Sequence, residues 1–354
     1  MKPGRAFTLV ELLVAAALGA LLALAAIAAV GGALAHWDRA TERLAMAAEA
    51  QVVLDQLAAD LQGAIVRGDG GTWLAVSVLA DTGLSGQWRP AAIPAQGKPG
   101  NAHPGTLDLA APGLERARFG VAGVWLRLLT TKADTGADAA SQPAPVAVGW
   151  QIVRRSVTSS LAAPQRYLLF RSEVRRTATA AGAPGTFEAG YDLDPAAEPP
   201  TAYMTASGTA GDPGNLIRPP LGSAFADDVV DFGVRLYVHE GSNLRLVFPA
   251  LPSGRGADPP AGVLTEAAPP SDETQHLARG GEPAAGDYYR HTFPDTADIM
   301  VRVLTGEGAR LIAAYEAGRL RPPAGTAAAD YWWTLAEGHS RVFTMRVAIP
   351  ARPL

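Results

Sequence analysis

One apolar run near the N-terminus dominates the pattern of hydrophobic and polar positions. From Leu12 to Ala35 no side chain is charged or strongly polar. As a helix this run would extend about 36 Å, enough to cross the roughly 30 Å hydrocarbon core of a bilayer. Lys2 and Arg5 precede the run, and basic residues favour the cytoplasmic side of a membrane. The pattern therefore predicts one membrane-spanning helix with its N-terminus in the cytoplasm.

A helical pattern continues beyond this run. Apolar residues recur at three- or four-residue multiples on one face, while acidic residues fall mostly elsewhere. The apolar set is Ala47, Leu54, Leu57, Leu61 and Ile65, and the acidic set is Glu42, Glu49, Asp55 and Asp60. No proline occurs between Arg5 and Pro90, and the glycine-rich residues 68–71 supply a stop signal. We predict a helix over residues 8–66 whose second half covers the core of a globular domain.

The rest of the chain alternates between strand patterns and loop-like stretches. Alternating or continuous apolar runs predict strands, and two later runs predict short helices at 309–318 and 331–337. The predicted strands are 73–79, 121–131, 146–158, 166–177, 229–239, 243–248, 299–304 and 341–349, with 146–158/166–177 and 229–239/243–248 as hairpins. Stretches rich in Ala, Gly, Pro and Asp predict loops at 90–112, 179–221 and 249–287.

These elements predict an α+β fold, in which one long helix packs on a mixed but mainly antiparallel sheet with long loops. The predicted divisions are a leader at 1–6, a transmembrane helix at 7–36, an amphipathic stalk at 37–67 and a β-rich globular domain at 68–354.

Composition narrows the range of functions. The 354 residues include 30 Lys and Arg, 34 Asp and Glu, and no Cys. The formal net charge of −4 argues against a strongly basic nucleic-acid binder. Without cysteine, the chain has no disulfide, no thiolate metal site and no Cys nucleophile.

The start of the apolar run carries a carboxylate, Glu11. An ordinary secretory signal has a shorter apolar stretch followed by a small-residue cleavage site, and this run is too long for one. A plain signal anchor explains the length but leaves Glu11 unexplained. Carboxylates at the membrane are costly and usually have a partner or a function.

Residues 7–15, Phe-Thr-Leu-Val-Glu-Leu-Leu-Val-Ala, resemble the N-terminal signature of type IV pilins and type II secretion pseudopilins. The resemblance implies that a prepilin peptidase cuts between Ala6 and Phe7, that Phe7 is then N-methylated, and that Glu11 is the fifth mature residue and serves in assembly. The family normally has Gly before the cut, where this chain has Ala6, another small residue.

The resemblance also implies a location and a set of partners. The chain would be a single-pass protein of the inner membrane, held through residues 12–35 with its C-terminal domain in the periplasm, before it enters a filament. Its partners would be the prepilin peptidase, other minor and major pilins or pseudopilins, and the inner-membrane assembly platform. No cofactor is expected.

The second half of the predicted helix is similar to the corresponding region of J-type minor pseudopilins and W-type minor pilins. Leu54, Leu57, Asp60 and Leu61 match the pattern Leu-x-x-Leu-x-x-Asp-Leu. A minor subunit also fits the length, because major subunits are usually much shorter.

Candidate chemistry elsewhere is sparse. The six histidines show no HExxH spacing, and neither a G-x-S-x-G elbow nor a P-loop occurs. Asp69 and Asp227–Asp228 raise the possibility of calcium, although EF-hand spacing is absent. Basic residues at 154–155 and 171–176 could face DNA, but a solvated sheet face is the favoured interpretation. The Trp332–Trp333 and Tyr288–Tyr289 pairs could be exposed contacts, but buried core aromatics are the more common explanation.

The sequence thus predicts a minor pilin or pseudopilin of the J/W group, a structural subunit for filament initiation or the filament tip and not an enzyme. The alternatives are a membrane-anchored periplasmic enzyme and a tip adhesin or binding module. The choice between a type II secretion system and a type IV pilus stays open.

Overall fold

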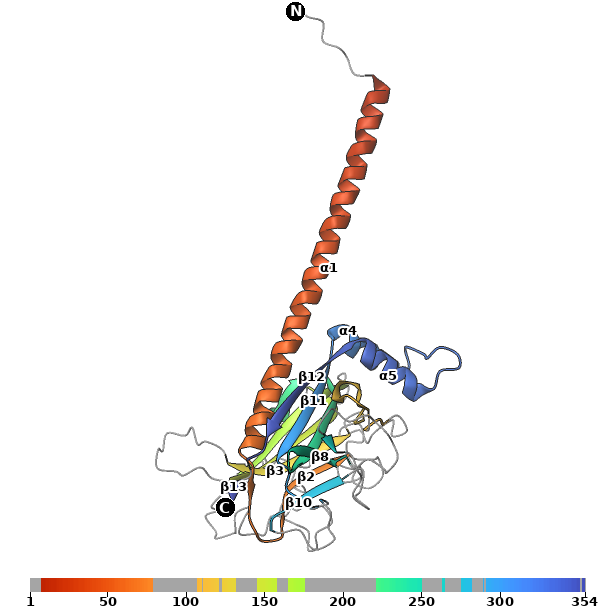
Figure 1. The fold of residues 1–354 in the computed structure, drawn as a ribbon. Coiled ribbons are helices and arrows are strands. Elements are labelled where there is room, and N and C mark those ends of the chain that lie inside the picture. Colours follow the sequence, from red (N-terminus) through yellow and green to blue (C-terminus); the bar gives the residue numbers. More distant parts are fainter. Residues whose placement is uncertain are drawn as a thin grey trace, which may run out of the picture. The chain divides into compact units, whose positions relative to one another are not determined.

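The computed structural model describes residues 8–78, 107–109, 111–120, 123–131, 145–157, 165–175, 221–249, 263–264, 275–281, 289, 291–350 and 352–353 (Figure 1). The chain divides into two units, residues 1–48 and residues 49–354. Helix α1, Leu9–Gln62, contributes to both. Within each unit the arrangement follows from the pattern of apolar residues.

Helix α1 confirms the predicted long helix but ends four residues earlier than expected. It runs without a break through Gly31 and Gly32. Gly63 forms a turn after it, and its backbone accepts a hydrogen bond from Thr131 N at 2.9 Å. Ile65, predicted on the apolar helix face, instead lies in β1, Ile65–Val66. The helix therefore ends before the glycine-rich residues 68–71, because the residues after Gly63 pair with strands instead.

The β-strands of the second unit form two large sheets, where the sequence predicted one. Their strands in chain order are β2 Thr72–Val78, β3 Val124–Thr131, β4 Pro145–Ser156, β5 Gln165–Arg175, β6 Ala224–Asp227, β7 Val229–Glu240, β8 Asn243–Phe248, β9 Val263–Leu264, β10 Gln275–Arg279, β11 Thr296–Leu304 and β12 Ser340–Ala348. The six-stranded sheet has the order β10-β2-β3-β4-β5-β6, and the five-stranded sheet has the order β12-β11-β7-β8-β9.

Almost all neighbouring strands are antiparallel, as the α+β prediction requires. Only β8–β9 and the small pair of β1 with β13, Arg352–Pro353, are parallel in the described part of the chain. Both predicted hairpins form, as β4–β5 and β7–β8. The loop predicted at 249–287 is wrong in part, because β9 and β10 lie within it. Five short strands, β1, β6, β9, β10 and β13, were missed because runs of two to five residues carry little periodicity.

Two helices follow β11 and confirm the predicted pair. They are α4, Gly306–Glu316, and α5, Ala328–Gly338. Thr305 caps α4, its Oγ1 accepting a hydrogen bond from Gly308 N at 3.0 Å. Trp332 and Trp333 of α5 are buried, so they are core aromatics as expected. Short 3-10 turns at Leu114–Arg116 and Leu221–Ser223 complete the described elements.

Candidate functional site

Glu11 lies in the first turn of α1 and is joined to Thr8. One carboxylate oxygen, Oε2, accepts hydrogen bonds from Thr8 N at 2.9 Å and from Thr8 Oγ1 at 3.0 Å. Thr8 Oγ1 in turn accepts a hydrogen bond from Glu11 N at 3.3 Å. This reciprocal arrangement is a capping box, which satisfies backbone donors at the start of a helix. Ala6 and Phe7, the predicted cleavage site, lie outside the described residues.

The capping box uses only part of the Glu11 carboxylate. Its second oxygen, Oε1, has no hydrogen-bond partner within the part of the chain that the structure describes, and the side chain is exposed. Glu11 can therefore start the helix and still offer a charge-bearing oxygen to another molecule. Sequence reasoning found the residue but missed its bond to Thr8.

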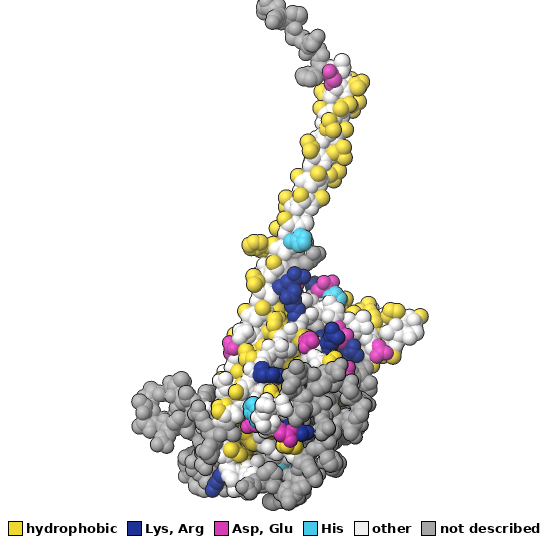
Figure 2. All heavy atoms as spheres, in the orientation of Figure 1, with side chains coloured by type: hydrophobic (Ala, Val, Ile, Leu, Met, Phe, Trp, Pro, Cys, Tyr) yellow, Lys and Arg dark blue, Asp and Glu magenta, His cyan; other side chains and the backbone are white. Residues whose placement is uncertain are grey.

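The segment Leu9–Leu34 of α1 is long and apolar enough to cross a membrane. Its mean hydropathy is 2.7, and its large apolar side chains are exposed, with Leu12 at 67% and Leu22 at 72%. Figure 2 shows hydrophobic side chains along this part of the helix. An apolar surface of this length in water would be very unfavourable, so lipid or other apolar helices must surround it.

A second cluster joins α1 to the six-stranded sheet at Asp60. Arg171 Nε donates to Asp60 Oδ2 at 2.8 Å, and Arg171 Nη2 donates to Oδ1 at 2.7 Å. Trp150 Nε1 and Gln56 Nε2 also donate to this carboxylate, at 2.8 and 3.2 Å. Thr130 Oγ1 donates to the Asp60 backbone oxygen at 2.8 Å. Asp60 is therefore a buried carboxylate with a full set of donors.

This cluster corrects two predictions. The acidic residues of the helix were expected mostly away from its apolar face, yet Asp60 is 4% exposed and lies among buried leucines. The basic residues from 171 onward were expected on a solvated sheet face, yet the Arg171 side chain is only 12% exposed. Burial favours a lower pKa for Arg171, but its hydrogen bonds to Asp60 and Glu173 outweigh burial and raise that pKa. The signal that could have identified Asp60 is its place between Leu57 and Leu61.

Glu316 forms a comparable link between α4 and the same sheet. It accepts hydrogen bonds from Tyr167 Oη, from Trp332 Nε1 at 3.1 Å and from Arg154 Nε at 2.8 Å. Burial, followed by the Glu316 charge, raises the pKa of Tyr167 well above its ordinary value. Arg154 was another of the basic residues considered for DNA contact, and here it neutralises a carboxylate.

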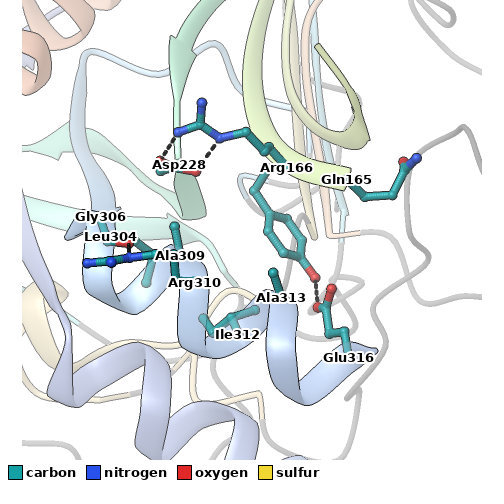
Figure 3. A pocket seen from close by; sticks show the side chains of 11 residues that line it. Gln165, Arg166, Asp228, Leu304, Gly306, Ala309, Arg310, Ile312, Ala313 and Glu316 are labelled. Atoms are coloured by element: carbon teal, nitrogen blue, oxygen red, sulfur yellow. Dashed lines mark hydrogen bonds and ion pairs between the residues drawn. The ribbon is translucent and has the colours of Figure 1, made fainter. Parts of the chain in front are cut away.

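A pocket of about 220 Å³ lies beside this link, between α4 and the start of β5 (Figure 3). Its apolar lining comprises Leu304, Ala309, Ile312 and Ala313, and Tyr167 also lines it. At its rim, Arg166 is bound to Asp228. The eleven residues that line it include no His, Ser, Thr or Lys. The two carboxylates of the lining are each held by an arginine, Asp228 by Arg166 and Glu316 by Arg154.

The other sequence candidates have local partners. Asp69 accepts hydrogen bonds from Gly71 N and Trp73 Nε1, both at 2.9 Å. Asp227 and Asp228, considered for calcium, are both bound by Arg166. Among the described residues no three His, Asp or Glu side chains are grouped closely enough to hold a metal. Tyr289 is half-buried, and Tyr288 lies outside the described residues.

Comparison with known proteins identifies the N-terminal segment. Residues 1–27 match the family described as the prokaryotic N-terminal methylation motif. No curated protein and no solved structure matches the chain. The motif covers the predicted leader, Glu11 and most of the apolar segment. It implies a type IV pilin-like subunit that is processed by a prepilin peptidase, anchored in the membrane before assembly, and assembled in the pilin manner.

Proposed function

We propose that this chain is a minor subunit of a pilus or type II secretion filament, of the J/W group, that acts in filament initiation or at the filament tip. The observation that carries the proposal is the methylation motif at residues 1–27, whose apolar part forms the start of a single 54-residue helix. Residues Leu54, Leu57, Asp60 and Leu61 support the J/W assignment, because all four are buried and Asp60 is held by Arg171. The four residues of the pattern thus help to pack α1 in the core of the second unit.

The proposed role is structural and not catalytic. The carboxylates that line the pocket beside α4 are already paired with arginines, which disfavours their use as a base or nucleophile. The long exposed apolar helix instead favours a protein that passes from lipid to a filament core, since both surround it with apolar groups.

Glu11 would act at the point of entry into the filament. Cleavage after Ala6 would create a new α-amine at Phe7, and in pilins the fifth-residue glutamate is thought to meet this amine on a neighbouring subunit. Pairing the two charges offsets the several kcal/mol that an unpaired carboxylate costs in an apolar environment. Glu11 Oε1, which is unused by the capping box, is the oxygen available for this contact.

The test separates the charge of Glu11 from its capping role. Glutamine can replace glutamate in a capping box, so Glu11→Gln keeps the helix start and removes only the charge. We expect Glu11→Gln and Glu11→Leu to insert in the membrane normally but to be depleted from purified filaments. Glu11→Asp should be partly active, because it keeps the charge on a shorter side chain.

Thr8→Ala is the matched control, because it weakens the cap and leaves the carboxylate in place. It should enter filaments at close to the wild-type level. Recovery is compared by immunoblot of sheared filaments at equal membrane levels. Equal recovery of Glu11→Gln and wild type would remove the proposed role of the charge, and the absence of wild-type chain from filaments would remove the proposed function itself.

A further inference from the structure

The four outer strands of the two large sheets differ greatly in regularity. Strand β9 has two residues, β6 has four with a register shift at Phe170, and β10 has five with a shift at Arg279. Short and irregular edges are how proteins prevent unwanted strand pairing. Strand β12 is the exception, with nine residues that pair one-to-one with β11 and show no register shift.

The hydrogen bonds that flank β12 define which of its backbone groups are free. Thr305 N donates to His339 O, and Ile349 N donates to Asp295 O, both at 2.8 Å. In an antiparallel ladder, hydrogen-bonded pairs alternate with non-bonded pairs. The odd-numbered residues of β12 therefore direct their N–H and C=O groups toward β11. The even-numbered ones direct theirs away from the sheet: Ser340, Val342, Thr344, Arg346 and Ala348.

Among the described residues, no other segment forms a backbone hydrogen bond to this outer edge, although the turn Leu114–Arg116 contacts β12. No strand lies beyond β12 in its sheet (Figure 1). Thr344, Arg346 and Ala348 are exposed, and the apolar side chains of Val342, Phe343 and Met345 are only half-buried. A row of unpaired backbone groups flanked by partly exposed apolar side chains is a template for an added strand.

The charges on β12 indicate what kind of strand would fit. Strand β12 carries two arginines and no carboxylate. Arg346 is neutralised by Asp298 through two hydrogen bonds of 2.6 and 2.8 Å. Arg341 is exposed and forms no ion pair within the described residues. A second copy of β12 would add two more arginines to the ladder, whereas a strand with a carboxylate opposite Arg341 would be complementary.

We infer that the free edge of β12 is a docking site for an extended segment of a different filament subunit, added as a further β-strand. The segment would have apolar residues beside Val342 and Met345 and an acidic residue near Arg341. This inference rests on the proposed function, because it takes the partner to be another subunit of the same filament. Pairing through alternate backbone groups would fix the position of the partner along β12.

Thr344→Pro tests the pairing directly. The Thr344 N–H points outward, so proline removes no bond to β11, and proline is tolerated on the open side of an edge strand. Phe343 is already extended, as the residue before a proline must be. Thr344→Val is the matched control, because it alters the same side chain and keeps the N–H. Arg341→Glu is a second variant, which leaves the backbone unchanged and reverses the charge that should select the partner.

The full-length chain is expressed with the other pilin-type subunits of its own system, extracted in detergent and recovered by an affinity tag. We expect Thr344→Pro to reduce recovery of a partner subunit about tenfold or more, because several ladder hydrogen bonds are lost together. Arg341→Glu should also reduce recovery, while Thr344→Val should match wild type. The melting temperature of each variant shows whether its fold is intact.

The outcomes are distinct. If Thr344→Pro and Arg341→Glu both recover the partner as well as wild type does, the docking site is overturned. The proposed function still stands in that case, provided that wild type is present in filaments. Self-association of the chain alone that Thr344→Pro abolishes would identify a second copy as the occupant and overturn the proposed partner. A third outcome is that the wild-type chain is absent from filaments but still pairs with another subunit through β12. This result would contradict the proposed function and leave the docking site standing.

Discussion

Asp60 of α1 and Arg171 of β5 form a two-point ion pair, with hydrogen bonds of 2.7 and 2.8 Å between nearly buried side chains. The pair joins the last turns of the helix to β5 of the six-stranded sheet. Trp150 donates to the same carboxylate, so the helix is held at a defined position along the sheet. The last turns of α1 therefore form part of the core of the second unit.

Replacing Asp60 with alanine should destabilise the second unit strongly. The substitution leaves the buried Arg171 charge with Glu173 as its remaining partner, and breaking a buried pair on one side costs about 3 kcal/mol or more. Urea unfolding of a fragment comprising residues 38–354 measures the loss. Asp55→Ala is the control on the same helix, since Asp55 is exposed and accepts a hydrogen bond from Gln51. Equal effects of the two substitutions would contradict the structural role of Asp60.

Removing the second half of α1 should cost solubility. Val53, Leu54, Leu57 and Leu61 are at most 3% exposed, so they belong to the core of the second unit. A fragment of residues 38–354 should be folded and monodisperse without reductant or metal. A fragment that begins at Thr72 should aggregate, because an apolar surface becomes exposed. Size-exclusion chromatography and thermal melts compare the two. Equal stability would show that this helix segment is not part of the core.

The stability of the second unit should depend on pH through Asp231. Burial raises the pKa of this carboxyl from 3.8 to about 7, although Arg302 on the facing strand, 3.9 Å away, opposes the shift and Glu337 adds to it. Between about pH 4 and pH 7 the folded state thus holds a proton that the unfolded chain has lost. The free energy of unfolding should therefore rise as pH falls from 8 to 5, by about 2 kcal/mol from this group.

Asp231→Asn removes this titration and should flatten the pH profile in that window. Denaturant unfolding of the 38–354 fragment at several pH values provides the measurement. Asp55→Asn, on the exposed face of α1, should leave the profile as it is in wild type. A profile that keeps its slope in Asp231→Asn would show that another group is responsible.

Processing is expected between Ala6 and Phe7. Mass spectrometry of the chain purified from its native membrane should find N-methylated phenylalanine at the start, and a strain without prepilin peptidase should retain residues 1–6. A mature chain that begins at Arg5, or beyond residue 30, would rule out the assigned cleavage site.

The sequence alone was sufficient for the features that depend on local patterns. The apolar run and the 3.6-residue periodicity predicted α1 to within a few residues, and the alternation in 229–239 and 243–248 predicted the β7–β8 hairpin. The methylation motif was also recognisable, because it is a contiguous signature. Each of these signals lies within one segment of the chain.

The tertiary structure alone determined the partners of charged residues and the order of strands. Nothing near Asp60 in the sequence identifies Arg171 or Trp150, which lie 111 and 90 residues away. Likewise, the run 341–349 predicted a strand without indicating that β12 would be an outer strand with a free side. The periodicity of apolar residues indicates which side chains are buried. The partner of a buried charged side chain, in contrast, depends on contacts between segments that are distant in the sequence. Those contacts exist only once the strands have paired and the last turns of α1 have packed against the six-stranded sheet.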